Sequence, residues 1–387
     1  MLDTGLDLHI YGEDAPLMLN MVQKILQQEV APHFEAWEAA CQLPRTLWNT
    51  LGQAGLLGVD MPAMYGGAET NFSVCAMICE EISRQGFGGL ASGYNIHANI
   101  VMPYILHLGT QAQKQAWLPA MIRGEVLGAI AMTEPHAGSD LAALKTQVVK
   151  VEKGWRLQGS KIFITNGVLA DLVIVCAKTD LKAGAKGISL FLVPADSPGF
   201  YKSRGIRKIG QHTSDTAELF FDNVFLPEDA LLGELNQGFI YLMEELPRER
   251  LGVAAQALGA IQGAIQLTFD YVKNRQVFGK KLSELQNTRF KLAEIYAQFT
   301  LGRAYFNQCL QAYVEGNLSV TDAAILKLKL TEMQCAATDE CLQLFGGYGY
   351  TQEYPISRFY VDARIQTIYA GTSEIMKEVI ARSLLGK

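Results

Sequence analysis

The chain has 387 residues and a mass of 42.5 kDa, which corresponds to roughly two to three domains of about 150 residues each. Hydrophobic residues make up 49% and charged residues 19%, so the chain can build a large core and is not disordered throughout. Its formal net charge of −6 argues against nucleic acid as a partner, because nucleic-acid-binding proteins usually carry an excess of basic residues.

No apolar run approaches the roughly 18 residues that a membrane helix needs, so we expect no membrane span. The N-terminal segment, residues 1–7, is acidic and lacks the basic-then-apolar layout of a signal peptide. The seven cysteines form no C-x-x-C pair, so we expect reduced thiols that act mainly as small buried hydrophobic side chains. These features predict a cytoplasmic protein.

The first third of the chain has helical periodicity. Apolar residues recur at three- and four-residue spacing and predict helices over 20–38, 46–55 and 73–85. From about residue 129 short β-branched runs replace this pattern and predict strands over 154–164, 171–177, 187–194 and 216–224. Turn residues separate these runs, which favours an antiparallel barrel or sandwich.

From residue 233 the chain returns to long helices, predicted over 238–274, 285–316, 320–345 and 374–385. Pro247 lies inside the first of them, and we expect it to kink or restart that helix near Leu246. The predicted fold class is α+β. It comprises an N-terminal helical domain over 1–128, an antiparallel β-barrel-like domain over 129–233 and a four-helix-bundle-like domain over 234–387.

The patterns of several common catalytic sites are missing from the sequence. It contains no P-loop, no H-E-x-x-H and no G-x-S-x-G, and its Gly347-Tyr348-Gly349 lacks the third glycine of a dinucleotide fingerprint. The six histidines are not spaced as metal ligands. We therefore predict no metal site, no phosphoryl transfer on a P-loop and no nucleophile elbow.

Four segments look more like sites than scaffold, although each also has an ordinary explanation. Segment 131–140 carries the hydroxyls of Thr133 and Ser139, which can bind an anion or a polar ring edge; a plain turn is the alternative. Segment 163–167 contains Asn-Gly, the mark of a hairpin turn. Segment 344–350 has three glycines at a helix end, and segment 368–375 can simply cap the last helix.

Taken together, in this order and spacing, these segments resemble the acyl-CoA dehydrogenase family. The resemblance rests on 131–140, 161–167, 274–280, 343–347 and 354–372, and it covers essentially the whole chain. It implies a non-covalent FAD whose isoalloxazine lies between the β-domain and the C-terminal helices. It also implies an acyl thioester as substrate and electron-transferring flavoprotein as the electron acceptor.

The resemblance assigns the FAD contacts residue by residue. Thr133, beside Met132, would bond the pyrimidine edge, Thr165 would approach N5 and Phe163 would pack near the flavin. Ser139 would lie near the pyrophosphate and the pantetheine arm of the thioester. The contacts expected to reach the FAD of a neighbouring subunit are Arg275, Phe278, Gln343, Gly346 and Gly347, with Thr372 and Glu374 on the adenosine side. A site shared in this way implies a homotetramer.

The catalytic base is a departure from part of the family. Medium- and short-chain members carry it directly before the final Gly-Thr, where this chain has Ala370, which cannot take a proton. Glu249-Arg250 resembles the pair that serves in the long-chain and isovaleryl types, so Glu249 is the expected base, with Glu244 and Glu245 as rivals. Without the resemblance, Glu249 would be a solvated helix carboxylate paired with Arg248, Arg250 or Lys273. The expected substrate contacts are Ser139, Arg250, Tyr369, Ala370 and Gly371.

The implied reaction is the FAD-dependent α,β-dehydrogenation of an acyl-CoA to a trans-2-enoyl-CoA. Glu249 would take the α-proton and FAD N5 the β-hydride. Two alternatives remain open at this point: an acyl-CoA oxidase or a dehydrogenase of acyl-carrier-protein thioesters, and a silent flavin-binding scaffold suggested by Ala370. His136 stands where the family commonly has glycine, and its effect is open.

Overall fold

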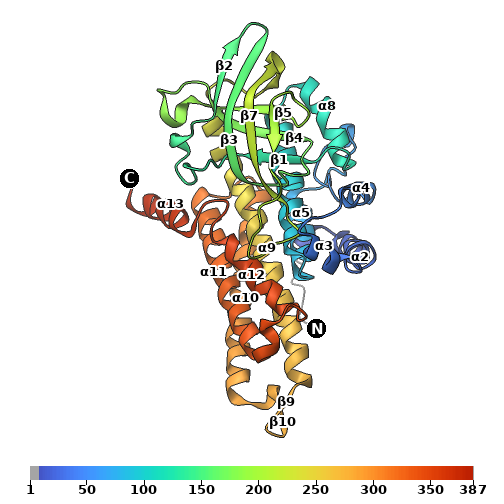
Figure 1. The fold of residues 1–387 in the computed structure, drawn as a ribbon. Coiled ribbons are helices and arrows are strands. Elements are labelled where there is room, and N and C mark those ends of the chain that lie inside the picture. The colour runs from blue at the N-terminus through green and yellow to red at the C-terminus, as the bar shows by residue number, and fades with distance from the viewer. Residues whose placement is uncertain (1–7, 387) are drawn as a thin grey trace.

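The computed structural model describes residues 8–386, in which a β-sheet unit lies between two helical units along the chain (Figure 1). The acidic segment 1–7 lies outside the described residues. Strands begin at Gly128 and the long C-terminal helices begin at Gly238. This order of helical, sheet and helical parts is the predicted one, and the proposed domain limits stay predictions.

The N-terminal part is built from short helices around one almost entirely buried helix, α5, whose residues from Phe72 to Ser83 are all buried. Next in the chain, α6, a π-helical turn and α7 follow one another without a break from Gly88 to Leu108. The bounds are α1 Leu8–Tyr11, α2 Ala15–Ile25, α3 Phe34–Ala40, α4 Arg45–Gln53, α5 Phe72–Arg84, α6 Gly88–Tyr94, the π-turn Asn95–Val101, α7 Met102–Leu108 and α8 Gln111–Ile122.

The middle part is a single eight-stranded sheet, paired in the order β6-β7-β3-β2-β4-β5-β8 with β1 beside β4. The strands are β1 Gly128–Ala131, β2 Gln147–Val151, β3 Gly154–Thr165, β4 Leu172–Lys178, β5 Ile188–Pro194, β6 Phe200–Lys202, β7 Thr216–Pro227 and β8 Leu231–Leu232. Most pairs are antiparallel as predicted, but β1 and β2 both pair with β4 in parallel. β1 escaped prediction because it has only four residues, two of them alanine, and lacks the longer β-branched run of β4.

The predicted hairpin at Asn166-Gly167 is wrong. β3 pairs with β2 and β7, and the next strand, β4, lies elsewhere in the sheet. Asn166 does adopt the left-handed conformation typical of an Asn-Gly turn, with φ of 61°. Its side chain, however, donates to the carbonyls of Gly93 and Gly128, so the turn ties β3 to a helix and to β1.

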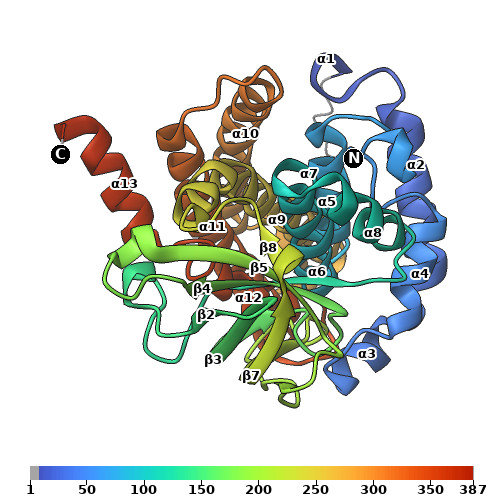
Figure 2. The same cartoon turned by 90° about the horizontal axis from the view of Figure 1, so that it is seen from above.

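The C-terminal part consists of long helices: α9 Gly238–Asn274, α10 Gln286–Val314, α11 Val320–Phe345, α12 Ile356–Gln366 and α13 Ser373–Leu385, with the small hairpin β9 Gln276–Val277 and β10 Lys280–Lys281 after α9. The expected restart at Pro247 does not occur, because α9 runs through it as one helix of 37 residues. Helices α5 and α11 both pack extensively on α9. Helix α13 projects from the body (Figures 1 and 2).

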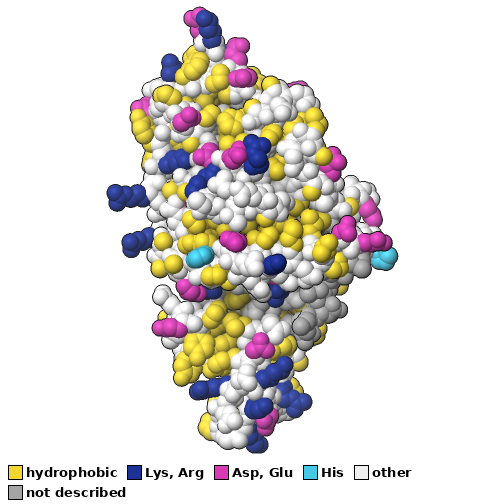
Figure 3. All heavy atoms as spheres, turned by 90° about the vertical axis from the view of Figure 1, so that its right-hand side faces the viewer, with side chains coloured by type: hydrophobic (Ala, Val, Ile, Leu, Met, Phe, Trp, Pro, Cys, Tyr) yellow, Lys and Arg dark blue, Asp and Glu magenta, His cyan; other side chains and the backbone are white. Residues whose placement is uncertain are grey.

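Two apolar cores organise the fold: a large one among the helices of both ends and the inner strands, and a second inside the sheet unit. On the face drawn in Figure 3, acidic and basic side chains are interspersed rather than sorted by sign. Among the described residues, no helix is long and apolar enough to cross a membrane.

Candidate active site

Glu249 is a buried carboxylate with a defined partner. It lies on α9 and is 3% exposed, and the hydroxyl of Tyr104, from α7, donates to its Oε1 at 3.0 Å. The pKa of Glu249 is raised to about 7, mainly by burial and also by the Glu245 carboxylate, against the opposing effects of Tyr104 and Arg250. A carboxyl poised near neutrality in a buried position suits proton transfer, unlike a solvated carboxylate on a helix surface.

The two arginines that flank Glu249 differ in their partners. Arg248 Nη2 lies 2.5 Å from Asp60 Oδ2, and its Nε donates to the Asn99 carbonyl at 2.8 Å. Arg248 is therefore bound within the core and does not neutralise Glu249. Arg250 is also buried, yet its Nε and Nη1 have no hydrogen-bond partner within the described residues. Because a buried unpaired donor is costly, Arg250 is the side chain here that is ready for a ligand.

The backbone around Ala370 forms a second part of the site. Ala370 and Gly371 both have positive φ, 51° and 90°, and the left-handed region is uncommon for alanine. The buried ammonium of Lys327, on α11, donates to the Gly371 carbonyl at 2.7 Å. The pKa of Lys327 is lowered to about 8, mainly by burial and also by nearby Arg250. Lys327 thus links the Ala370 turn, through its bond to Gly371, with the α9 segment that carries Arg250 and Glu249.

Tyr369 and Thr372 hold the ends of this turn. The Tyr369 hydroxyl donates to Gln256 Oε1 at 3.2 Å on α9. Thr372 is the N-cap of α13 and accepts a hydrogen bond from the N–H of Ile375. Capping, the simpler reading of this segment, is therefore present at Thr372, while Glu374 is exposed in the first turn of α13.

The predicted flavin contacts Thr133 and Thr165 lie along the same edge of the sheet unit. Thr133 follows β1, and its carbonyl accepts a hydrogen bond from the N–H of Ile162 in β3 at 3.0 Å. Thr165 ends β3. Both threonines and Met132 are half-buried, and neither threonine hydroxyl has a hydrogen bond within the described residues. These two free hydroxyls fit a ligand with polar ring atoms.

Phe163 sits in an irregularity of β3 that turns its ring outward. The pairing of β3 with β7 shifts register between Lys161 and Ile164, and Phe163 has φ of 61°. Such a bulge re-aims a side chain, and the Phe163 ring is 61% exposed. An exposed aromatic ring beside two free hydroxyls is a surface on which an aromatic cofactor such as a flavin can pack.

A buried ion pair fixes the loop that carries Thr133. Lys161 Nζ lies 2.9 Å from both Glu134 Oε1 and the Met132 carbonyl, and both side chains are about 1% exposed or less. The N–H groups of Lys145 and Thr146 also donate to Glu134. Burial opposes ionisation of Glu134, but Lys161 and these N–H groups outweigh it and hold its pKa below the usual range. His136, the unexplained departure, lies 3.3 Å from the same carboxylate.

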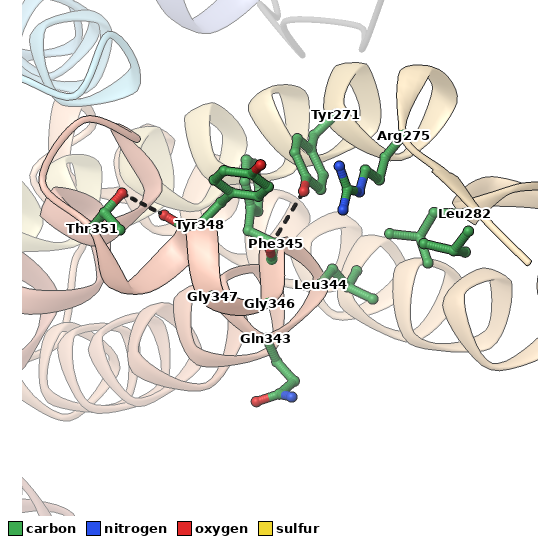
Figure 4. Close-up of a pocket in the computed structure, with 11 residues that line it drawn as sticks. Tyr271, Arg275, Leu282, Gln343, Leu344, Phe345, Gly346, Gly347, Tyr348 and Thr351 are labelled. Atoms are coloured by element: carbon green, nitrogen blue, oxygen red, sulfur yellow. Dashed lines mark hydrogen bonds between the residues drawn. The ribbon is translucent and has the colours of Figure 1, made fainter.

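Four other predicted cofactor residues gather near the end of the molecule that carries the β9–β10 hairpin, away from the sheet (Figure 1). A pocket of about 480 Å³ there is lined by Arg275, Gln343, Gly346 and Gly347 (Figure 4). The Arg275 guanidinium lies 5.3 Å from the centre of the Tyr348 ring. Gly346 has φ of 61° and ψ of −139°, a conformation that only glycine adopts readily.

Phe278 and Ser139 lie on the surface. Phe278, at the tip of the β9–β10 hairpin, is 98% exposed, and Ser139 is exposed in the loop after β1. One copy of the chain therefore brings together Thr133, Thr165 and Phe163, but it does not bring them together with Arg275 and Gln343.

Sequence reasoning missed four residues that shape the site. Glu134 stood inside a recognised segment, and its position next to Thr133 could have drawn attention. Lys161 stood inside the recognised segment 161–167, but its partner Glu134 is 27 positions away. Tyr104 and Lys327 gave no local signal, because each acts on a partner at least 44 positions away in the chain.

Models of three domains match the chain from end to end: the acyl-CoA dehydrogenase N-terminal domain over residues 12–125, the middle domain over 129–224 and the C-terminal domain over 236–385. The mouse mitochondrial long-chain specific acyl-CoA dehydrogenase is 44% identical over 387 residues, covering 100% of this chain and 89% of that protein. The mitochondrial isovaleryl-CoA dehydrogenase of Solanum tuberosum is 37% identical, covering 94% and 88%.

Solved structures agree with these matches. An acyl-CoA dehydrogenase from Geobacillus kaustophilus superposes with a TM-score of 0.94 at 42% identity, covering 96% of this chain and 98% of that one. A glutaryl-CoA dehydrogenase from Mycobacterium smegmatis in complex with FADH2 has a TM-score of 0.92 at 32% identity, with coverage of 100% and 97%. A chain in the structure of the electron transferring flavoprotein of Acidaminococcus fermentans has a TM-score of 0.94 at 35% identity, with full coverage of both.

These matches span all three parts of the fold and include the segments that build the site. The chain belongs to the acyl-CoA dehydrogenase family, whose members are FAD-dependent oxidoreductases that act on a CH–CH group.

Proposed function

We propose that this chain catalyses the FAD-dependent α,β-dehydrogenation of an acyl-CoA thioester, with Glu249 as the base. The observation that carries the proposal is the buried Glu249 carboxyl, held by Tyr104 and poised near neutrality. When bound, FAD supplies the acceptor for the β-hydride. Thr133, Thr165 and the exposed face of Phe163 are the residues that would hold the flavin ring.

The role of Glu249 follows from the acidity of the substrate. The α C–H of a thioester is a weak acid, so the base needs a high proton affinity and the developing enolate oxygen needs hydrogen-bond donors. Burial supplies the first requirement at Glu249. The N–H groups of Ala370 and Gly371 have no hydrogen-bond partner within the described residues, and Lys327 holds their turn, so they can supply the second. Arg250, with two unpaired guanidinium nitrogens, adds positive charge beside the thioester.

An anaerobic reduction experiment tests the proposed reaction. The purified protein is expected to be yellow with bound FAD, and an acyl-CoA thioester is expected to bleach the flavin without oxygen. Colourless protein that takes up no added FAD, or flavin that no acyl-CoA reduces, would contradict the proposal. Reaction of the reduced protein with electron-transferring flavoprotein rather than oxygen identifies a dehydrogenase. The likeness to a chain in the A. fermentans flavoprotein structure supports this acceptor.

We also propose that the working form is a homotetramer in which neighbouring copies complete each other's cofactor site. The pocket with Arg275, Gln343, Gly346 and Gly347 lies far from Thr133 and Thr165 in one copy, which supports a site that two copies complete together. The exposed Phe278 ring and the projecting α13, whose Leu384 and Leu385 are 76% and 74% exposed, offer apolar surface for a neighbouring copy.

Arg275→Ala is expected to lower FAD occupancy and to shift the protein toward smaller assemblies, because charge-assisted hydrogen bonds to a cofactor phosphate are among the stronger ones. Sedimentation with absorbance detection measures both quantities in one experiment. Arg289→Ala, at an exposed position outside the pocket, is the matched control. A variant that keeps full FAD content and the wild-type assembly would contradict the shared site.

The cytoplasmic location stays a prediction. The described residues contain no membrane-spanning helix, and the mouse relative is mitochondrial. Fractionation of the source cells, with detection of the protein in each fraction, tests it.

A further inference from the structure

Two cross-helix contacts lie one above the other beside Glu249. On α7, Tyr104 and His107 are three positions apart; on α9, Glu245 and Glu249 are four apart, so each pair shares one face of its helix. Tyr104 bonds Glu249 at 3.0 Å, and His107 Nδ1 lies 2.6 Å from Glu245 Oε1. The two helices thus present an inner pair and an outer pair.

The outer pair is more exposed to solvent than the base. Glu249 is 3% exposed, the Glu245 side chain 12% and the His107 side chain 46%. The Glu245 carboxylate raises the pKa of Glu249, because like charges at this helical spacing repel. His107 can carry a positive charge when protonated and then offsets the charge of Glu245.

We propose that Glu245 and His107 form a positioning pair. The proton affinity of Glu249 then depends on whether His107 is protonated. This inference rests on the proposed role of Glu249 as the base. The Glu245 carboxylate makes a second negative charge at Glu249 unfavourable, so it strengthens the base. A protonated His107 cancels part of that charge and weakens the base.

The other titratable groups around the base do not replace this pair. Burial raises the pKa of the Tyr104 hydroxyl and of the Cys176 thiol, from β4, so both stay neutral. Arg250 is buried on α9 itself, and Lys327, from α11, faces Arg250. Tyr313, from α10, also faces Glu245, and burial raises its pKa. Among these groups, only His107 is both in contact with Glu245 and substantially exposed.

The test is the pH dependence of anaerobic flavin reduction by an acyl-CoA in the FAD-loaded protein. Glu245→Gln is expected to move the midpoint of the acid limb to lower pH by about half a unit to one unit, because one like charge is removed. His107→Gln is expected to move it to higher pH, because the charge of Glu245 is then unopposed. In Glu245→Gln, adding His107→Gln is expected to have no further effect on the midpoint. Glu244→Gln removes the same charge from an exposed position on α9 and is the matched control.

A second readout observes the base directly. Infrared difference spectra against Glu249→Gln isolate the carboxyl band of Glu249, whose midpoint of protonation is expected to move as the rate profile does. A merely structural role for the outer pair would change rates or stability without opposite shifts in pH. Equal shifts in Glu245→Gln and Glu244→Gln, shifts of one sign in Glu245→Gln and His107→Gln, or no shift in either would overturn the inference while the proposed function stands. Rapid reduction of Glu249→Gln would overturn the proposed function itself.

Discussion

Glu249→Gln is expected to bind FAD and acyl-CoA as the wild type does, but to lose flavin reduction by about 10²–10⁴-fold or more. The substitution keeps the shape of the side chain and its contact with Tyr104, while an amide cannot accept the α-proton. Stopped-flow absorbance under anaerobic conditions measures the reduction rate. Glu244→Gln is the control for the loss of a carboxylate from the same helix. If Glu249→Gln reduces flavin at close to the wild-type rate, Glu245 is the next candidate, because it is the half-buried one of the two rivals.

Adding Ala370→Glu to this variant is expected to restore part of the activity. Both positions are expected to approach the same α-carbon, and medium- and short-chain members place their base at the position of Ala370. Ala370 already adopts φ of 51°, so a glutamate meets the same backbone cost there as alanine does. The unpaired N–H groups of Arg250 can stabilise the new carboxylate. A double variant that reduces flavin no faster than Glu249→Gln would show that the two positions do not approach the same α-carbon.

Lys161→Met is expected to lower the free energy of unfolding by about 3–5 kcal/mol and to weaken FAD binding. The substitution leaves the Glu134 carboxylate buried with two backbone N–H groups and the half-exposed His136 as its remaining partners, and it frees the Met132 carbonyl next to Thr133. Thermal unfolding of the apo and FAD-loaded protein measures the stability, and flavin titration measures the affinity. A loss in affinity beyond the loss in apo stability identifies the loop as part of the site.

Lys150→Met is the matched control for this prediction. Lys150 pairs with Glu228 at 2.8 Å, but both side chains are more than half exposed, so the substitution is expected to cost at most about 1 kcal/mol. Equal destabilisation by Lys150→Met and Lys161→Met would show that burial of the Glu134–Lys161 pair has no special effect.

The parts of the fold that could be predicted are those with a strong local pattern. Helices such as α11 and strands such as β7 repeat their apolar residues with the right period, so their positions follow from the sequence to within a few residues. The four residues of β1 are too few to show a periodic pattern of apolar residues. The continuous helix through Pro247 and the turn at Asn166 depend on packing partners that local pattern does not contain.

The residues of the candidate site also fall into those that the sequence could predict and those that it could not. Thr133, Thr165 and Glu249 stand in segments whose order along the chain resembles one family, and the structure gives each a fitting environment. Tyr104, Lys161 and Lys327 act only through contacts with residues far away in sequence, such as the bond from Lys327 to Gly371. Such partners are set by the tertiary fold, and a single sequence carries no local signal of them.

The separation of the two groups of cofactor residues has a consequence for mixed assemblies. If each site takes Glu249 from one copy and Arg275 from a neighbouring copy, then Glu249 and Arg275 of the same chain serve two different sites. An assembly that pairs an Arg275→Ala chain with a Glu249→Gln chain then holds one site with both defects and one site with neither. Two defective variants can therefore complement each other within one assembly. A chain without its own base can still supply Arg275 to the site of its neighbour.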